Sequence, residues 1–171
     1  MSNVRGSAAV LVLMKGEESQ SEVLLIERSA TVNTHKSQVA FPGGGVEPMD
    51  QNDPIRTALR ECFEEVGISP QHVKVIKTLP QLPTLTSGFF VVPVLGALKP
   101  VNPNEVITLT LDPNEVAHSE WVSVQSLLGT KRVENGFPVF DWVGKDHKTR
   151  KVWGLTAIIF ELIFNSDTKS L

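Results

Sequence analysis

The chain has 171 residues, of which 41% are hydrophobic and 20% charged, and this composition is typical of one globular domain spanning residues 1–171. A net charge of −3 without a long run of Lys or Arg argues against a nucleic-acid partner. The single cysteine, Cys62, excludes an internal disulfide. We expect a cytoplasmic protein with no membrane association, because no targeting or membrane-spanning segment stands out.

Two strands are expected first, over 7–14 and 22–28, separated by a polar turn that contains a glycine. A polar loop over 31–38 follows. A short apolar run over 39–41 then leads into the glycine-rich segment Pro42-Gly43-Gly44-Gly45.

The strongest local prediction is a helix that begins after Asp53. Asp53 is suited to the N-cap, and Pro54 to the first helical position. The helix should run to about Val66, because Gly67 is typical of a C-terminal cap.

Further strands are expected over 73–79, 88–98, 106–111 and 116–122, and a short helix over 124–128. A turn-rich stretch should extend through residue 141. Apolar residues at helical spacing predict a last helix over 153–164. The order of elements indicates a mixed α+β fold.

Three glutamates mark a candidate site on the helix after Asp53. A period of 3.6 residues places Glu61, Glu64 and Glu65 within about 100° of one another, opposite an apolar stripe. Like charges at this spacing repel one another, and hard divalent cations bind such oxygen ligands. Three glutamates alone are most often a solvated acidic face, so the choice between such a face and a metal site depends on the neighbouring residues.

Two neighbouring features favour a metal site. The glycine run that includes Gly43 and Gly44 lets the backbone approach a ligand closely, and its carbonyls can join a metal site. Arg60 can orient a glutamate through a charge-assisted hydrogen bond.

These residues belong to a recognisable motif. Residues 60–68, Arg-Glu-Cys-Phe-Glu-Glu-Val-Gly-Ile, resemble the second half of the Nudix box, R-E-U-x-E-E-x-G-U, where U is aliphatic. The resemblance implies an α/β/α sandwich with a mixed central sheet and hydrolysis of a phosphoanhydride. It also implies that Mg²⁺ or Mn²⁺ is held by Glu61, Glu64, Glu65 and the backbone of Gly44. The catalytic residues implied are Glu61, Glu64, Arg60 and, as an additional acid beyond the box, Glu115.

The first half of the motif departs from the family pattern. The family has Gly-x5-Glu followed by seven residues before the arginine, whereas Gly44-x5-Asp50 is followed here by nine. The loop is therefore longer by two residues, and no metal role is assigned to Asp50.

A narrower resemblance concerns the substrate. Residues 24–29 and 39–44 resemble the signature of coenzyme A pyrophosphatases within the Nudix superfamily, L-L-T-x-R-[SA]-x3-R-x3-G-x3-F-P-G-G. Asn33 replaces the second arginine of that signature and Ser37 its glycine. Including further stretches, the similarity extends from about residue 7 to 164. The substrate-binding residues it implies are Arg28, Asn33, His35, Lys36, Phe41, Gly43 and Gly44.

The implied activity is hydrolysis of coenzyme A or its thioesters to 3′,5′-ADP and the 4′-phosphopantetheine part. The departures at Asn33 and Ser37 leave open another Nudix substrate, such as ADP-ribose, NADH or an oxidised nucleoside triphosphate. A non-catalytic nucleotide-sensing module is a further alternative. The partner in each case is a small nucleotide, and the protein is expected to be a monomer or homodimer. The sequence does not identify the general base or the number of metals.

Overall fold

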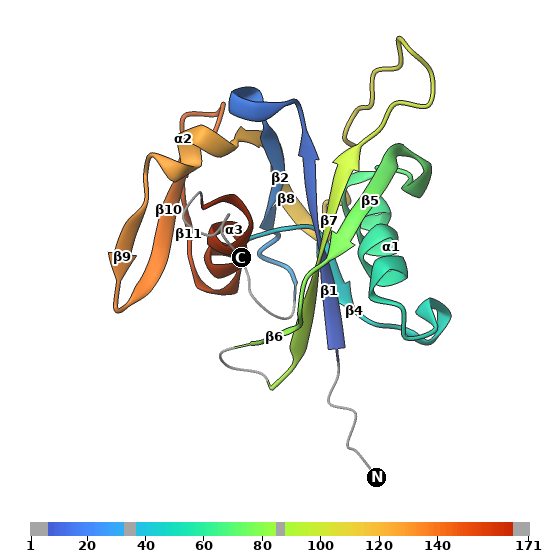
Figure 1. Ribbon diagram of the computed structural model, residues 1–171, viewed down its shortest axis with the longest axis horizontal. Coiled ribbons are helices and arrows are strands. Elements are labelled where there is room, and N and C mark those ends of the chain that lie inside the picture. The colour runs from blue at the N-terminus through green and yellow to red at the C-terminus, as the bar shows by residue number, and fades with distance from the viewer. Residues whose placement is uncertain (1–6, 33–36, 85–87, 166–171) are drawn as a thin grey trace.

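The computed structural model describes residues 7–32, 37–84 and 88–165. Its main sheet has the strand order β3-β2-β1-β7-β5, with β4 paired to β1, β6 to β7 and β8 to β2 (Figure 1). Strand β1 runs parallel to β7 and the other pairs are antiparallel, so the sheet is mixed as expected. The strands are β1 (Ser7–Lys15), β2 (Glu22–Arg28), β3 (Val39–Ala40), β4 (Gly43–Gly45), β5 (Val73–Thr78), β6 (Leu82–Pro83), β7 (Phe90–Leu98) and β8 (Val116–Ser123).

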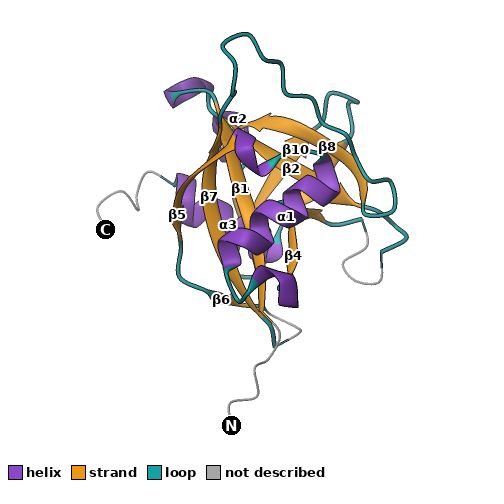
Figure 2. Cartoon of the chain, turned by 90° about the vertical axis from the view of Figure 1, so that its right-hand side faces the viewer, coloured by secondary structure: helices purple, strands orange, loops and turns teal. Residues whose placement is uncertain are grey.

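Helices cover both faces of this sheet. Helix α1 (Pro54–Val66) packs on one face, where it lies in front of β1 and β7 in Figure 2. Helix α3 (Gly154–Phe164) lies on the other face together with the shorter α2 (Val124–Leu128). The described residues also form three single-turn 3-10 helices, at Glu18–Gln20 (η1), Pro48–Asp50 (η2) and Pro70–His72 (η3). This arrangement confirms the expected α+β fold, a sandwich of helices on both faces of a mixed sheet.

The apolar residues of strand β1 contribute to two hydrophobic cores, one on each face of the sheet. Leu11 and Leu13 face α1, while Val12 between them faces α3, because successive side chains of a strand point to opposite faces. All three are fully buried, as expected for a central strand covered on both sides.

The helix predicted after Asp53 is confirmed. The Asp53 side chain accepts a hydrogen bond from the Ile55 backbone N–H at 2.9 Å, and Gly67 adopts a left-handed φ of 78° at the C-terminal end. Within the described residues, no helix combines the length and apolar character needed to cross a membrane.

Two sequence-based expectations were wrong. Residues 106–111 form no strand, because this segment binds the end of α1 instead: the Thr110 N–H donates to the Val66 carbonyl at 2.8 Å. The stretch through residue 141 is not turn-rich throughout, since it contains most of the hairpin β9 (Arg132–Glu134) and β10 (Phe137–Val143), and β10 also pairs with β11 (Thr149–Val152). Asn135 and Gly136 make the hairpin turn with positive φ angles, which is a local signal for a tight hairpin.

Candidate active site

The glycine-rich strand β4 brings the backbone against two glutamates of α1. The Gly43 N–H donates to Glu65 Oε1 at 2.7 Å. A Cβ placed on Gly44 would lie 2.6 Å from the carboxylate carbon of Glu61, so a larger residue would clash there. A side chain at position 44 would therefore displace the Glu61 carboxylate, whereas at Gly43 a Cβ would lie 2.7 Å from the Val10 Cα of β1, so the close approach requires glycine at position 43.

The three glutamates differ widely in exposure. The Glu64 side chain is 52% exposed, that of Glu61 17%, and that of Glu65 only 2%. The prediction that all three share the exposed face is therefore wrong for Glu65. Its position borders the apolar stripe of the helix, one turn after the fully buried Cys62, and β4 covers it.

Burial makes negative charge costly at this site. It raises the pKa of Glu65 to about 8, although the hydrogen bond from the Gly43 N–H and the nearby Arg28 act in the opposite direction. Burial also raises the pKa of Glu61. A bound cation would favour the ionised form of both carboxylates. The oxygen donors gathered here, from Glu61, Glu64, Glu65 and the Gly44 backbone, fit a hard divalent cation such as Mg²⁺ or Mn²⁺.

Arg60 holds two of the glutamates and the glycine-rich strand together through its hydrogen bonds. Its Nη1 donates to Glu61 Oε1 and to Glu64 Oε2, both at 3.1 Å. Its Nη2 also donates to the Gly45 carbonyl at 3.2 Å. One guanidinium thus connects the glycine-rich strand with two of the three glutamates, as the sequence analysis anticipated for a glutamate-orienting arginine.

Asp50 anchors Arg60. The two side chains form a bidentate pair, with Nε and Nη2 of Arg60 each 2.9 Å from one carboxylate oxygen. Asp50 is 2% exposed and also accepts hydrogen bonds from the Glu47 N–H and the Thr57 hydroxyl, both at 2.9 Å. The hydrogen bonds from Arg60 hold the pKa of Asp50 well below its ordinary value. Asp50, to which the sequence alone assigns no metal role, is therefore a positioning residue for Arg60.

The remaining predicted residues fall into three groups. Arg28, at the end of β2, lies with Nη1 4.0 Å from Glu65 Oε2, and the negative charge of the exposed Glu115 acts on the same carboxyl. Phe41 is 2% exposed and packs in the core shared with α3, so its predicted contact with substrate does not agree with its burial. The third group, Asn33, His35 and Lys36, lies outside the described residues.

A second polar cluster lies on the opposite face of the sheet, at residues that match no motif in the sequence. Ligand-type atoms of His118, Glu120 and Asp146 lie within 4.8 Å of one another. The Nε2 atom of His118 is 2.7 Å from Glu120 Oε2. The histidine ring also stacks near Trp142 of β10, with ring centroids 5.7 Å apart.

Arg150 and a backbone amide occupy the oxygens of this second cluster. Arg150 donates to both carboxylate oxygens of Asp146, at 3.0 and 2.7 Å, and its Nε donates to Glu27 Oε1 at 3.2 Å. The Lys145 N–H donates to Glu120 Oε1 at 2.8 Å. The second cluster is therefore a connected network that joins β2 and β8 to the β10–β11 hairpin.

The arrangement of glycine-rich strand, arginine and glutamates has relatives among known proteins. The NUDIX domain family profile matches residues 5–143. The chain is also 39% identical, over 145 residues, to the uncharacterized Nudix hydrolase NudL of Photorhabdus laumondii, an alignment covering 80% of this chain and 72% of that one. The chain belongs to the Nudix hydrolase family. It is accordingly an enzyme of the pyrophosphatase type, acting on phosphoanhydrides.

Two further comparisons extend the family assignment. Nudix hydrolase 22, chloroplastic, of Arabidopsis thaliana is 36% identical, and the alignment covers 89% of this chain but 52% of that protein. Among solved structures, a C. elegans Ap4A hydrolase binary complex superposes with a TM-score of 0.55 at 23% identity, covering 72% of this chain and 84% of that one. At this identity the structural likeness supports the shared fold alone.

Proposed function

We propose that this Nudix hydrolase cleaves the diphosphate of coenzyme A or its thioesters, releasing 3′,5′-ADP and the 4′-phosphopantetheine part. The observation that carries the proposal is the position of Arg28, whose Nη1 lies 4.0 Å from Glu65 Oε2. Arg28 belongs to the segment that resembles coenzyme A pyrophosphatases, and Glu65 belongs to the Nudix box. The fold thus joins two motifs 37 residues apart into one site.

The chain's own residues have distinct tasks in this reaction. Glu61, Glu64, Glu65 and the Gly44 backbone would hold Mg²⁺ or Mn²⁺, which when bound neutralises the diphosphate and lowers the pKa of an attacking water. Arg60 keeps Glu61 and Glu64 in place through its hydrogen bonds.

Water attack forms one P–O bond and breaks the P–O bond to the leaving phosphate. A general base then accepts the proton of that water. Glu115 is the proposed acceptor, because it is exposed and its charge is felt by the buried Glu65 carboxyl. Arg28 contributes positive charge for a phosphate of the substrate.

Another Nudix substrate is favoured by one observation, the two departures from the coenzyme A signature at Asn33 and Ser37. An arginine at position 33 would be a natural partner for the 3′-phosphate of coenzyme A. The alternatives are ADP-ribose, NADH and an oxidised nucleoside triphosphate. A purely sensing module is disfavoured, because such a module does not need the complete set of three glutamates.

A substrate panel tests the proposal. Coenzyme A, acetyl-coenzyme A, ADP-ribose and NADH are each incubated with the protein and Mg²⁺ or Mn²⁺, and products are identified by mass. We expect 3′,5′-ADP from the first two at the highest kcat/KM. Preferred cleavage of ADP-ribose or NADH would reject coenzyme A as the substrate.

A second measurement isolates the 3′-phosphate. With asparagine at position 33, the kcat/KM ratio of coenzyme A to 3′-dephospho-coenzyme A should stay below about ten, and Asn33→Arg should raise it by supplying a charge-assisted contact. Asn33→Gln is the matched control and should leave the ratio unchanged. A wild-type ratio near about a hundred would show that another group binds this phosphate.

A further inference from the structure

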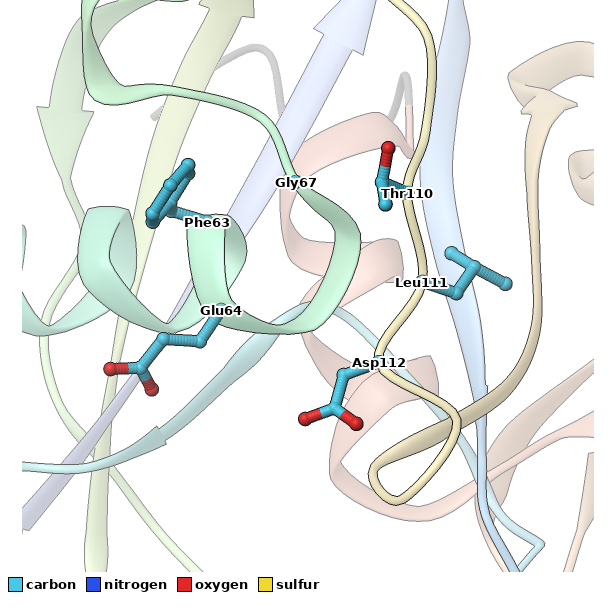
Figure 3. Close-up of a pocket in the computed structure, with 6 residues that line it drawn as sticks. All are labelled: Phe63, Glu64, Gly67, Thr110, Leu111 and Asp112. Atoms are coloured by element: carbon cyan, nitrogen blue, oxygen red, sulfur yellow. The ribbon is translucent and has the colours of Figure 1, made fainter.

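An open groove of about 400 Å³ lies beside the last turn of α1. It is lined by Phe63, Glu64 and Gly67 from the helix and its cap, and by residues 110–112 from the loop before β8 (Figure 3). Backbone hydrogen bonds hold the two walls together, since the Asp112 N–H donates to the Glu65 carbonyl at 3.0 Å and Thr110 N–H binds the Val66 carbonyl. The groove is therefore built on a fixed contact between helix and loop.

The groove adjoins the candidate metal site. Glu64 contributes to both, because it lines the groove and its carboxylate is bound by Arg60. A substrate whose diphosphate lies at Glu61 and Glu64 can extend one of its two halves along this wall. A volume of about 400 Å³ is in the range of small-molecule sites.

The groove is negatively charged. Its charged lining residues, Glu64 and Asp112, are both acidic, and both carboxylates lie along the same side of the groove in Figure 3. The C-terminal end of α1 adds the negative end of the helix dipole. An additional phosphate group would be repelled here, whereas hydroxyl and amide donors would find acceptors.

Apolar surface completes the groove. Phe63 is 53% exposed, although it belongs to a helix whose other large apolar residues pack against the sheet. Leu111 also lines the groove, but its side chain is partly buried against the core beneath α1 and points away from Phe63 in Figure 3. An aliphatic or aromatic group bound against Phe63 would cover surface that is otherwise in contact with water.

We propose that this groove binds the half of the substrate that carries no phosphate beyond the diphosphate. For coenzyme A this is the pantetheine arm, whose amide and hydroxyl groups match the acidic wall and whose aliphatic part matches Phe63. The 3′,5′-ADP half then extends to the side of Arg28, whose positively charged guanidinium lies 4.0 Å from Glu65. This inference rests on the proposed function and adds the orientation of the substrate.

Binding of the two product halves tests the orientation without turnover. Dissociation constants of 4′-phosphopantetheine and 3′,5′-ADP are measured by calorimetry with Mg²⁺ for the wild type and three variants. Phe63→Ala should weaken the binding of 4′-phosphopantetheine by about threefold or more, because the aromatic contact is lost, and should leave the binding of 3′,5′-ADP unchanged. Thr110→Arg should also weaken the binding of 4′-phosphopantetheine, because the larger side chain fills the groove. Val143→Ala, which alters an exposed apolar residue on β10, is the matched control and should change neither.

Two outcomes would overturn the proposal. One is weaker binding of 3′,5′-ADP to the Phe63→Ala variant, and the other is unchanged binding of both products to both groove variants. Circular dichroism of each variant verifies folding. The substrate panel tests the proposed function separately. If that panel selects ADP-ribose or NADH, the same comparison uses the two monophosphate products, and weaker binding of only one of them in both groove variants supports the groove as the site of that half, whereas unchanged binding of both overturns it.

Discussion

The two acidic clusters of the protein lie on opposite faces of the same sheet and differ in how their charges are balanced. In the α1 cluster, defined by Glu61, Glu64 and Glu65, Arg60 is shared with Asp50, and Arg28 approaches Glu65 only to 4.0 Å. Glu65 has a pKa raised to about 8 by burial, and the charge on Glu61 is similarly disfavoured. The negative charge of the carboxylates in this cluster is therefore not fully balanced by protein groups.

The second cluster, defined by His118, Glu120 and Asp146, has its donors in place. Arg150 binds both carboxylate oxygens of Asp146. One carboxylate oxygen of Glu120 is hydrogen-bonded to the His118 ring, and the other accepts a hydrogen bond from the Lys145 backbone N–H. Its atoms are close enough to hold a cation, yet they already have protein partners. Ligand-type atoms that lie close together therefore indicate a metal site only when protein groups do not already compensate their charge.

Loss of a carboxylate should have its largest effect in the α1 cluster. Glu64→Gln and Glu65→Gln should each lower kcat at least about a hundredfold, because metal-held transition-state stabilisation is lost. Steady-state kinetics with Mg²⁺ present measures the change, and circular dichroism verifies folding. Glu120→Gln in the second cluster is the comparison and should leave kcat unchanged. Wild-type turnover in either α1 variant would contradict the catalytic assignment.

The anchor of Arg60 should matter for stability as well as activity. Asp50→Asn should lower the free energy of unfolding by about 2 kcal/mol, because a buried carboxylate with four hydrogen-bonding contacts is lost while Arg60 keeps its glutamate partners. Urea denaturation measures the difference.

The same anchor predicts a pH dependence. The folded-state pKa of Asp50 is lowered, so its contribution to stability is present above its ordinary value of 3.8 and lost as the pH falls below it. The gap in stability between wild type and Asp50→Asn should therefore narrow in acid. A constant gap from pH 7 to pH 3 would show that the Asp50–Arg60 pair does not carry the effect.

Breaking the second cluster should affect folding alone. Arg150→Met keeps much of the side-chain volume but removes the cation that binds Asp146 and Glu27, so we expect a loss of about 1–2 kcal/mol in the free energy of unfolding. The kcat of the folded variant should be unchanged. A large fall in kcat without loss of stability would give this cluster a part in the reaction.

The smallest effect concerns metal binding in the absence of substrate. Saturation of the α1 cluster with millimolar Mg²⁺ or Mn²⁺ should stabilise the protein by about 1 kcal/mol and raise the melting temperature by about 2–4 °C. The double variant Glu61→Gln, Glu64→Gln should lose this rise, and Arg150→Met should retain it. A rise that persists in the double variant and disappears in Arg150→Met would move the metal to the second cluster.

Features set by neighbouring residues could be predicted from the sequence. The caps at Asp53 and Gly67, the apolar stripe of α1 and the spacing of the glutamates depend on helical geometry and local hydrogen bonds, and the predicted helix agrees with the structure. The Asn135-Gly136 turn is equally local, and its hairpin could have been predicted from that dipeptide. The motif at 60–68 pointed to the family for the same reason, because its spacing is contained within one helix and its cap.

Features that depend on distant segments required the tertiary structure. The burial of Glu65 depends on β4, which is 22 residues away in the chain at the hydrogen bond from Gly43. The position of Phe41 in the core depends on α3, and residues 106–111 form no strand because their backbone pairs with the end of α1. Periodicity shows which side of a helix is apolar, but it does not show which neighbouring segment covers the border of that side. Desolvation and charge balance at Glu65 and Asp50 are therefore decided only when the strand, the loop and the helix pack together.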